Sequence, residues 1–219
     1  MVGIRHVVRA LLEAAVASSA AAKSLALFRK SGSGGNVIYV LYDPSTLEAS
    51  LQDSGDPTNV IFGYLDVKPH KADCWGAGEV KFAAAQKGYG PLMYELAMSD
   101  FPNGIMPDRF STSAAARNVW KRYAQRPDVK AKPFDDVLDP KTAPKTDDCK
   151  VMPDWDGEEA FLNAAYVGGG DGAGKPAMMA THKDAVTTLS EKLALKPAEV
   201  ESRILDMGDE YFGSRYRDG

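Results

Sequence analysis

The sequence predicts an α+β fold in which a mixed β-sheet is flanked by helices. Two strand-like segments, SLALFRK (24–30) and NVIYVLYD (36–43), are separated by SGSGG, which is typical of a hairpin connection. The segment GEVKFAAA (78–85) alternates with the period of two that a strand requires. Gly90 and Pro91 then open a helix, with proline in the first turn, where its missing N–H costs nothing. Hairpins followed by strand–helix crossovers indicate a mixed sheet.

The N-terminus predicts an amphipathic helix over about residues 3–24. Its apolar residues recur at i, i+3, i+4, i+7 and i+8, which places them on one helix face. Three roles are open for it: packing on its own domain, docking into a larger assembly, or a secretion signal whose apolar part Glu13 would interrupt. The apolar face consists of Ile4, Val7, Val8, Leu11 and Leu12.

The rest of the chain divides into further expected elements. Residues 59–69 predict a third strand, and 43–58 predict a loop with one helical turn. A helix to Asp100, a second helix capped within 111–113, a short strand near 129–134 and an ordered piece at 158–166 follow. The tail predicts two helices split at Lys196-Pro197. The expected organisation is an N-terminal helix (1–24), a main domain (25–135), a Pro/Asp/Gly-rich extended segment (136–180) and a C-terminal helical arm (181–219).

Composition and charge narrow the class of protein. The 219 residues include 44% hydrophobic and 26% charged residues, with a net charge of −4, so no nucleic-acid partner is expected. No apolar run approaches the roughly 20 residues of a membrane span, so no membrane partner is expected either. Cys74 and Cys149 form no CxxC or Cys/His cluster, which argues against a metal site. We expect two buried free thiols, since a disulfide needs an oxidising compartment.

The Gly88-Tyr89-Gly90 turn lies between a predicted strand and a predicted helix. Backbone amides at a helix N-terminus carry partial positive charge, and glycines let a phosphate approach them closely. The turn is therefore a candidate pyrophosphate site. It is not a P-loop, because GxxxxGK[ST] is absent, and it is not a Rossmann fingerprint, because the third glycine is missing.

The strand, turn and helix resemble motif A of the GNAT N-acyltransferases, whose turn reads [QR]-x-x-G-x-[GA]. Both glycines match, whereas Ala85 stands at the Gln/Arg position. The segment STSAAARNVWKRYAQRPDV resembles the second element of that family, with Trp120 at the place of its usual acid tyrosine. The resemblance covers about residues 25–135 and implies a mostly antiparallel GNAT-like sheet and an acetyl-CoA cofactor. It implies that the pyrophosphate is held by Ala85, Gln86, Lys87, Gly88, Tyr89 and Gly90.

The same resemblance suggests catalytic candidates. Glu79, near the start of its strand, is a candidate general base, and Tyr123 a candidate proton donor to the leaving thiolate. The alternatives are a solvated strand-edge glutamate and a Trp120/Tyr123 pair that packs a helix on the sheet. A Cys74–His70 nucleophile pair is a further possibility. RFSTS followed by DGEEAF also resembles elements of ADP-ribosyltransferases, although the serines equally suit a helix N-cap.

A second resemblance is to uncharacterised tailed-phage proteins. KGYGPLMYELAM, IMPDRFSTSAAARNVWKRYAQRPDV and IRHVVRALLEA are similar to their motifs, and Leu11 to Ala14 is similar to a prohead-protease site. This implies a phage protein in the virion or host cytoplasm, and otherwise a cytoplasmic one, with virion or capsid partners at the N-terminal helix and C-terminal arm. We therefore expect an acyl-CoA-dependent N-acyltransferase-like protein or, alternatively, a non-catalytic virion- or capsid-associated structural protein that keeps a GNAT-like fold.

Overall fold

A computed structural model describes residues 25–32, 35–53, 57–70, 74–109, 111–134, 149, 151, 154, 157–168 and 175–213. The helix predicted over 3–24 and the L-x-E pattern lie outside these ranges.

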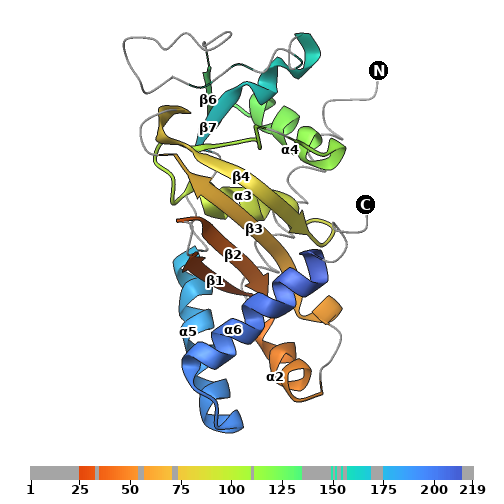
Figure 1. The fold of residues 1–219 in the computed structure, drawn as a ribbon, viewed down its shortest axis with the longest axis vertical. Coiled ribbons are helices and arrows are strands. Elements are labelled where there is room, and N and C mark those ends of the chain that lie inside the picture. The colour runs from red at the N-terminus through yellow and green to blue at the C-terminus, as the bar shows by residue number, and fades with distance from the viewer. Residues whose placement is uncertain are drawn as a thin grey trace.

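The described residues form a seven-stranded mixed sheet (Figure 1). Its spatial order is β1-β2-β3-β4-β5-β7-β6, and every neighbouring pair is antiparallel except β4 and β5. The predicted α+β class is therefore confirmed. The strands are β1 (Ala26–Ser31), β2 (Val37–Tyr42), β3 (Ile61–Pro69), β4 (Gly78–Ala85), β5 (Ile105–Met106), β6 (Val129–Pro133) and β7 (Ala164–Gly168).

Helices cover both faces of the sheet. In Figure 1, α6 crosses in front of β1 and β2, whereas α3 lies behind the sheet. The single helical turn expected within 43–58 is wrong, because α2 has ten residues and buries Leu47 completely. The α-helices are α2 (Pro44–Asp53), α3 (Gly90–Met98), α4 (Ala114–Gln125), α5 (Lys175–Leu193) and α6 (Pro197–Gly208). The short turns are η2 (Pro57–Asn59), η3 (Cys74–Gly76), η4 (Gly157–Leu162) and η5 (Asp209–Gly213), the last of π type.

The apolar core has a part on each side of the sheet. One part packs α3 and α4 on the sheet, with Met93 and Trp120 among its buried residues. The other packs α2, α5 and α6 on the opposite face, with Val186 and Ile204 at its centre. The C-terminal helices thus bury apolar stripes against β1–β3, which makes them part of the main core.

Two features extend the folded unit beyond residues 25–135. Strand β7 comes from the segment expected to be extended and inserts between β5 and β6. Helix α5 begins at Lys175, whose ammonium is buried and contacts the Asp100 carboxylate and the carbonyl of Leu96 just before the end of α3. Residues from 164 onward therefore supply a strand of the sheet and a buried cation at the C-terminal end of α3.

The two cysteines form a disulfide, so the expectation of free thiols is wrong. The Cys74 and Cys149 Cα atoms lie 4.6 Å apart, within the range that a disulfide requires. Both residues are buried in a small apolar cluster that also contains Ala77, Met106 and Phe134. The two cysteines are 75 residues apart in sequence, so no local pattern could indicate that they meet.

None of the helices within the described ranges combines the length and the apolar character that crossing a bilayer would need.

Candidate functional site

The candidate site begins where β4 and β5 separate. These parallel strands pair only at Gly78 opposite Ile105 and Glu79 opposite Met106. Beyond Glu79, β4 continues to Ala85 while the chain after β5 turns away toward α4. Among the described strands, the remaining length of β4 therefore pairs on one side only, with β3.

A bulge lies at this point of separation. The β3–β4 register steps from Asp66 opposite Phe82 to Val67 opposite Val80, so Lys81 is the extra residue of β4. A bulged residue is left out of the regular ladder, which can re-aim its backbone and side chain. The Lys81 side chain is directed to Asp108, with Nζ 2.6 Å from the nearer carboxylate oxygen.

At its other end, β4 leads into the predicted glycine turn. Gly88 has φ +96°, in the left-handed region that favours glycine, and Gly90 is the first residue of α3. A Cβ atom built on either glycine would have no atom within 4 Å. Among the described residues, none accepts a hydrogen bond from the backbone amides of these two glycines. The turn therefore presents amides and the N-terminus of α3 to open space.

The other residues of the turn have different surroundings. The Gln86 side-chain amide donates to the carbonyls of Thr58 and Ile61, the latter at 2.8 Å, so it anchors the turn to the start of β3. The Tyr89 ring packs edge-on against Phe62, with centroids 4.9 Å apart. Lys87 is exposed. Gln86 and Tyr89 thus shape the turn, while Lys87 and the glycines are open to a ligand.

Two adjoining cavities follow the unpaired part of β4. The outer cavity, of about 360 Å³, is lined by Ala85 and Gly90 at the turn and by Val119 of α4. The inner cavity, of about 280 Å³, is lined by Lys81, Asp108 and the residues preceding α4. The two form a continuous groove between β4 and α4, because both are lined by Ala83, Tyr94, Ser113 and Ala116.

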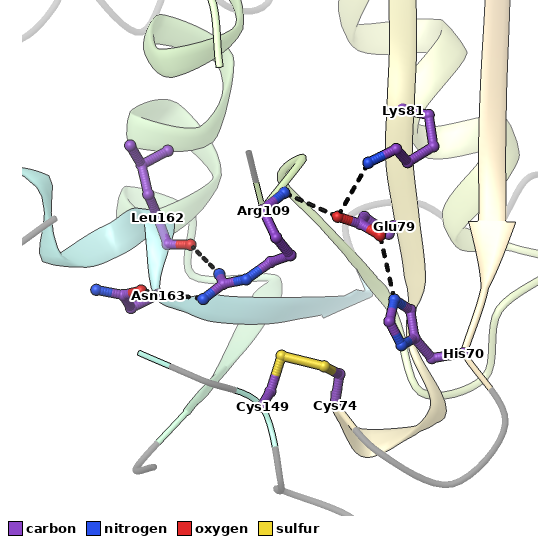
Figure 2. Close-up of a disulfide and its surroundings, with 8 residues drawn as sticks. All are labelled: His70, Cys74, Glu79, Lys81, Arg109, Cys149, Leu162 and Asn163. Atoms are coloured by element: carbon purple, nitrogen blue, oxygen red, sulfur yellow. Dashed lines mark hydrogen bonds and ion pairs between the residues drawn. A yellow bond between two sulfur atoms is a disulfide. The ribbon is translucent and has the colours of Figure 1, made fainter. Parts of the chain in front are cut away.

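Glu79 lies beside the inner end of the groove, but its side chain is held in an ionic network (Figure 2). It accepts a hydrogen bond from the Arg109 backbone amide at 2.8 Å, and it lies 3.3 Å from Lys81 Nζ and 3.2 Å from His70 Nε2. Burial would raise the pKa of Glu79, but the bonds to His70, Arg109 and Lys81 outweigh it and lower the pKa to about 2. A carboxylate so stabilised is a weak base at neutral pH.

Arg109 joins the same network to the next strand. Its guanidinium is buried and donates to the Leu162 carbonyl at 3.2 Å and to Asn163 Oδ1 at 3.4 Å, immediately before β7. Burial lowers its pKa to about 10, against the opposing influence of Glu79 and Asp108. This bridge connects Glu79 of β4 to the residues immediately before β7.

Tyr123 lies away from both cavities. It is buried, and its hydroxyl donates to the Pro91 carbonyl at 3.0 Å. Burial is the main reason that its pKa is raised far above the usual range of tyrosine, with the negative charge of Glu95 adding to the effect. Trp120 packs between Tyr94 and Tyr166, at centroid distances of 5.0 and 5.5 Å. These contacts form an aromatic cluster that packs α4 against α3. The role of Tyr123 as a proton donor stays a prediction.

The structure brings Ala85 and Gly90 together on the groove and places Lys87 and Gly88 beside it. Sequence reasoning missed Tyr94, Asp108 and Val119 as lining residues. Their only signal was position: Tyr94 is one turn into the helix after the glycines, and Val119 falls in the segment that resembles the second family element. Only the path of the chain after β5 shows that Asp108 faces β4.

Across the described part of the chain, no group of three or more His, Cys, Asp or Glu side chains is placed to hold a metal ion. Comparisons of the chain with protein-family models, with curated proteins and with solved structures give no match.

Proposed function

We propose that this chain is an acyl-CoA-dependent N-acyltransferase-like protein with a GNAT-like fold. The observation that carries the proposal is the groove along the unpaired part of β4, which runs from the Gly88–Gly90 turn to the point where β4 and β5 separate. Such a groove suits a long ligand with a charged end and an amide-containing arm. Acyl-CoA has this composition.

The groove can divide the ligand between its two ends. The diphosphate would lie at Gly88 and Gly90, where open backbone amides and the α3 N-terminus favour an anion. From Ala85 to the bulge at Lys81, β4 extends for four residues, or about 13 Å. The pantetheine arm carries two amides and can pair with the open strand edge as an added peptide strand does. Its thioester would then reach the inner cavity.

At that position, acyl transfer mainly requires that the thioester and the acceptor amine be held in the correct relative orientation. The acceptor amine attacks the thioester carbonyl carbon, the new C–N bond replaces the C–S bond, and the amine proton balances the departing thiolate. Holding the two reactants in line accounts for much of such a rate enhancement. The irregular backbone at the Lys81 bulge offers a candidate donor for the carbonyl oxygen. Glu79 is a weak base because its pKa is lowered to about 2. Its contacts with Lys81 and Arg109 instead suit it to a structural role at this end of the groove.

A second candidate is a non-catalytic virion- or capsid-associated protein of phage origin that retains the fold. The observation favouring it is that both catalytic candidates are occupied: Glu79 by three partners and Tyr123 by the Pro91 carbonyl. In that case the predicted N-terminal helix would supply the main contact with an assembly, because α5 and α6 already bury their apolar stripes on the sheet.

Calorimetric titration with acetyl-CoA tests the proposal. We expect micromolar binding to the full chain and loss of at least about 2 kcal/mol of binding free energy in Gly90→Glu, which sets a carboxylate where the diphosphate would lie. The Gly90 backbone is not left-handed and its surroundings are open, so the variant should fold.

Ala180→Glu is the matched control, because it adds the same charge at an exposed position of α5. Equal affinities of the two variants would contradict the proposed diphosphate site. Absence of heat from the unmodified chain at millimolar acetyl-CoA would reject the acyl-CoA proposal and leave the structural role. Binding without release of CoA thiol in the presence of a panel of primary amines would favour the non-catalytic candidate.

A further inference from the structure

The outer mouth of the groove carries a cation that the proposed diphosphate site does not use. Arg122 is exposed on the last turn of α4. On a helix, positions three and four apart share a face, so Arg122 continues the row formed by Ala115 and Val119, which line the outer cavity. Arg122 is therefore the next side chain on the helix face whose earlier members, Ala115 and Val119, line the outer cavity.

A tertiary contact fixes this end of α4 beside the glycine turn. The hydroxyl of Tyr123, the next residue after Arg122, donates to the carbonyl of Pro91, the next residue after Gly90. Val119 and Gly90 line the same cavity. The last turn of α4, which carries Arg122, therefore lies on the α4 side of the cavity that Gly90 lines from the turn.

The cationic side chains near the outer cavity differ in whether they form ion pairs. Arg126 is held by Glu95 and Asp128, and Arg117 by Glu159. Within the described residues, Arg122 and Lys87 have no ion pair or side-chain hydrogen bond. The chain has a net charge of −4, so two exposed cations without a described partner, one on the turn and one on α4, are a local positive feature beside the outer cavity.

We propose that Arg122 binds a phosphomonoester of the ligand, namely the ribose phosphate that distinguishes coenzyme A from dephospho-coenzyme A. The inference rests on the proposed acyl-CoA function. Lys87 belongs to the turn that would hold the diphosphate, whereas Arg122 lies on α4, the other wall of the outer cavity. The ribose of a ligand with its diphosphate on Gly88 and Gly90 would leave the groove between these two elements. The planar guanidinium donates two parallel hydrogen bonds to a phosphate, which a lysine cannot do.

The simpler role for Arg122 is to complement the negative C-terminal end of α4. That role predicts a small loss of stability on substitution and no preference between ligands. The ligand role predicts a preference for coenzyme A and an unchanged melting temperature.

The test is calorimetric titration of the full chain with coenzyme A and with dephospho-coenzyme A, for the unmodified protein, Arg122→Ala, Arg122→Lys and Lys121→Ala. Lys121 is the matched control, being exposed and adjacent but outside the row that leads from the cavity. We expect coenzyme A to bind about tenfold more tightly than dephospho-coenzyme A. The ratio should fall to about one in Arg122→Ala, fall partly in Arg122→Lys and persist in Lys121→Ala.

The outcomes separate this inference from the function on which it rests. Equal affinity of the two ligands for the unmodified protein would overturn the role of Arg122 and leave acyl-CoA binding intact. A preference that survives in Arg122→Ala would overturn it as well. Failure of both ligands to bind would reject the proposed function and this inference together. Loss of the preference in Arg122→Ala alone, with the melting temperature unchanged, would support it.

Discussion

At the scale of single residues, Glu79 shows how partners decide the role of an ionisable side chain. The sequence placed a carboxylate near the start of a strand, which is compatible with a base. Its hydrogen bonds to His70, Arg109 and Lys81 instead stabilise the charged form. A carboxylate with such partners contributes to the stability of the fold and makes a poor proton acceptor.

Glu79→Gln should lower the free energy of unfolding by about 2 kcal/mol at pH 7, because it removes a buried charge to which three donors are directed. The pKa of Glu79 falls from 4.5 to about 2 on folding, so the stabilisation is complete above about pH 4.5 and is lost as the pH falls toward 2. Urea unfolding of both proteins between pH 7 and pH 2.5 would measure the difference.

Glu48→Gln is the control, since Glu48 forms an exposed ion pair with Lys192 and should change stability by less than about 0.5 kcal/mol. A difference between Glu79→Gln and the unmodified chain that stays constant across the pH range would contradict the lowered pKa.

At the scale of elements, β5 shows how a two-residue strand can organise a site. It pairs with β4 on one side and β7 on the other, and because it is so short, most of β4 has no second partner among the described strands. Gly104, just before β5, makes this possible. It has φ +90°, and a Cβ atom there would overlap the backbone carbonyl of Tyr166 in β7. The close approach of β7 therefore requires glycine at this position.

Gly104→Ala should destabilise the protein by about 3–5 kcal/mol, because it combines an unfavourable left-handed backbone with a clash against a strand that cannot move independently. Thermal unfolding followed by circular dichroism would measure the effect. Gly88→Ala isolates the backbone cost, since Gly88 also has positive φ but open surroundings, and it should cost only about 1 kcal/mol. Similar losses in the two variants would show that the β5–β7 contact is looser than described.

At the scale of the whole molecule, the last helices complete the core. Val186, Leu189, Val200 and Ile204 are buried against the β1–β3 face. Lys175 adds a polar connection, because its ammonium contacts Asp100 and the carbonyl of Leu96 in α3. Without α5 and α6, α2 would be the one described helix left on this face of the sheet, and most of the apolar surface of β1–β3 would be exposed.

A chain ending at residue 174 should therefore fail to unfold cooperatively and should bind hydrophobic dyes, because the exposed apolar face leaves no single packed core. Far-ultraviolet and near-ultraviolet circular dichroism with urea titration would test this. A chain ending at residue 213, which keeps both helices, is the matched control. A cooperative transition of the 174-residue chain, with native near-ultraviolet signals, would contradict this prediction and show that the chain folds without α5 and α6.

Much of the local structure could be predicted from local signals. The period of two in 78–85 identified β4, and the serines at 111–113 predicted the N-cap that Ser113 supplies, its Oγ accepting from the Ala116 amide at 3.2 Å. The glycine turn was also predictable, since glycine spacing and a following proline are short-range features. By contrast, α2 was underestimated, because its burial against α5 depends on a distant part of the chain.

By itself, the sequence determined the α+β class, the β1–β2 hairpin and the strand–turn–helix at Gly88–Gly90, because these depend on residues adjacent in the chain. Only the tertiary structure decided that Glu79 is ion-paired, that Cys74 meets Cys149, that β7 inserts beside β5 and that the end of α4 packs beside the glycine turn through Tyr123 and Pro91. Each of these joins residues that are distant in sequence, and their meeting follows from the packing of the whole core, which no local pattern encodes.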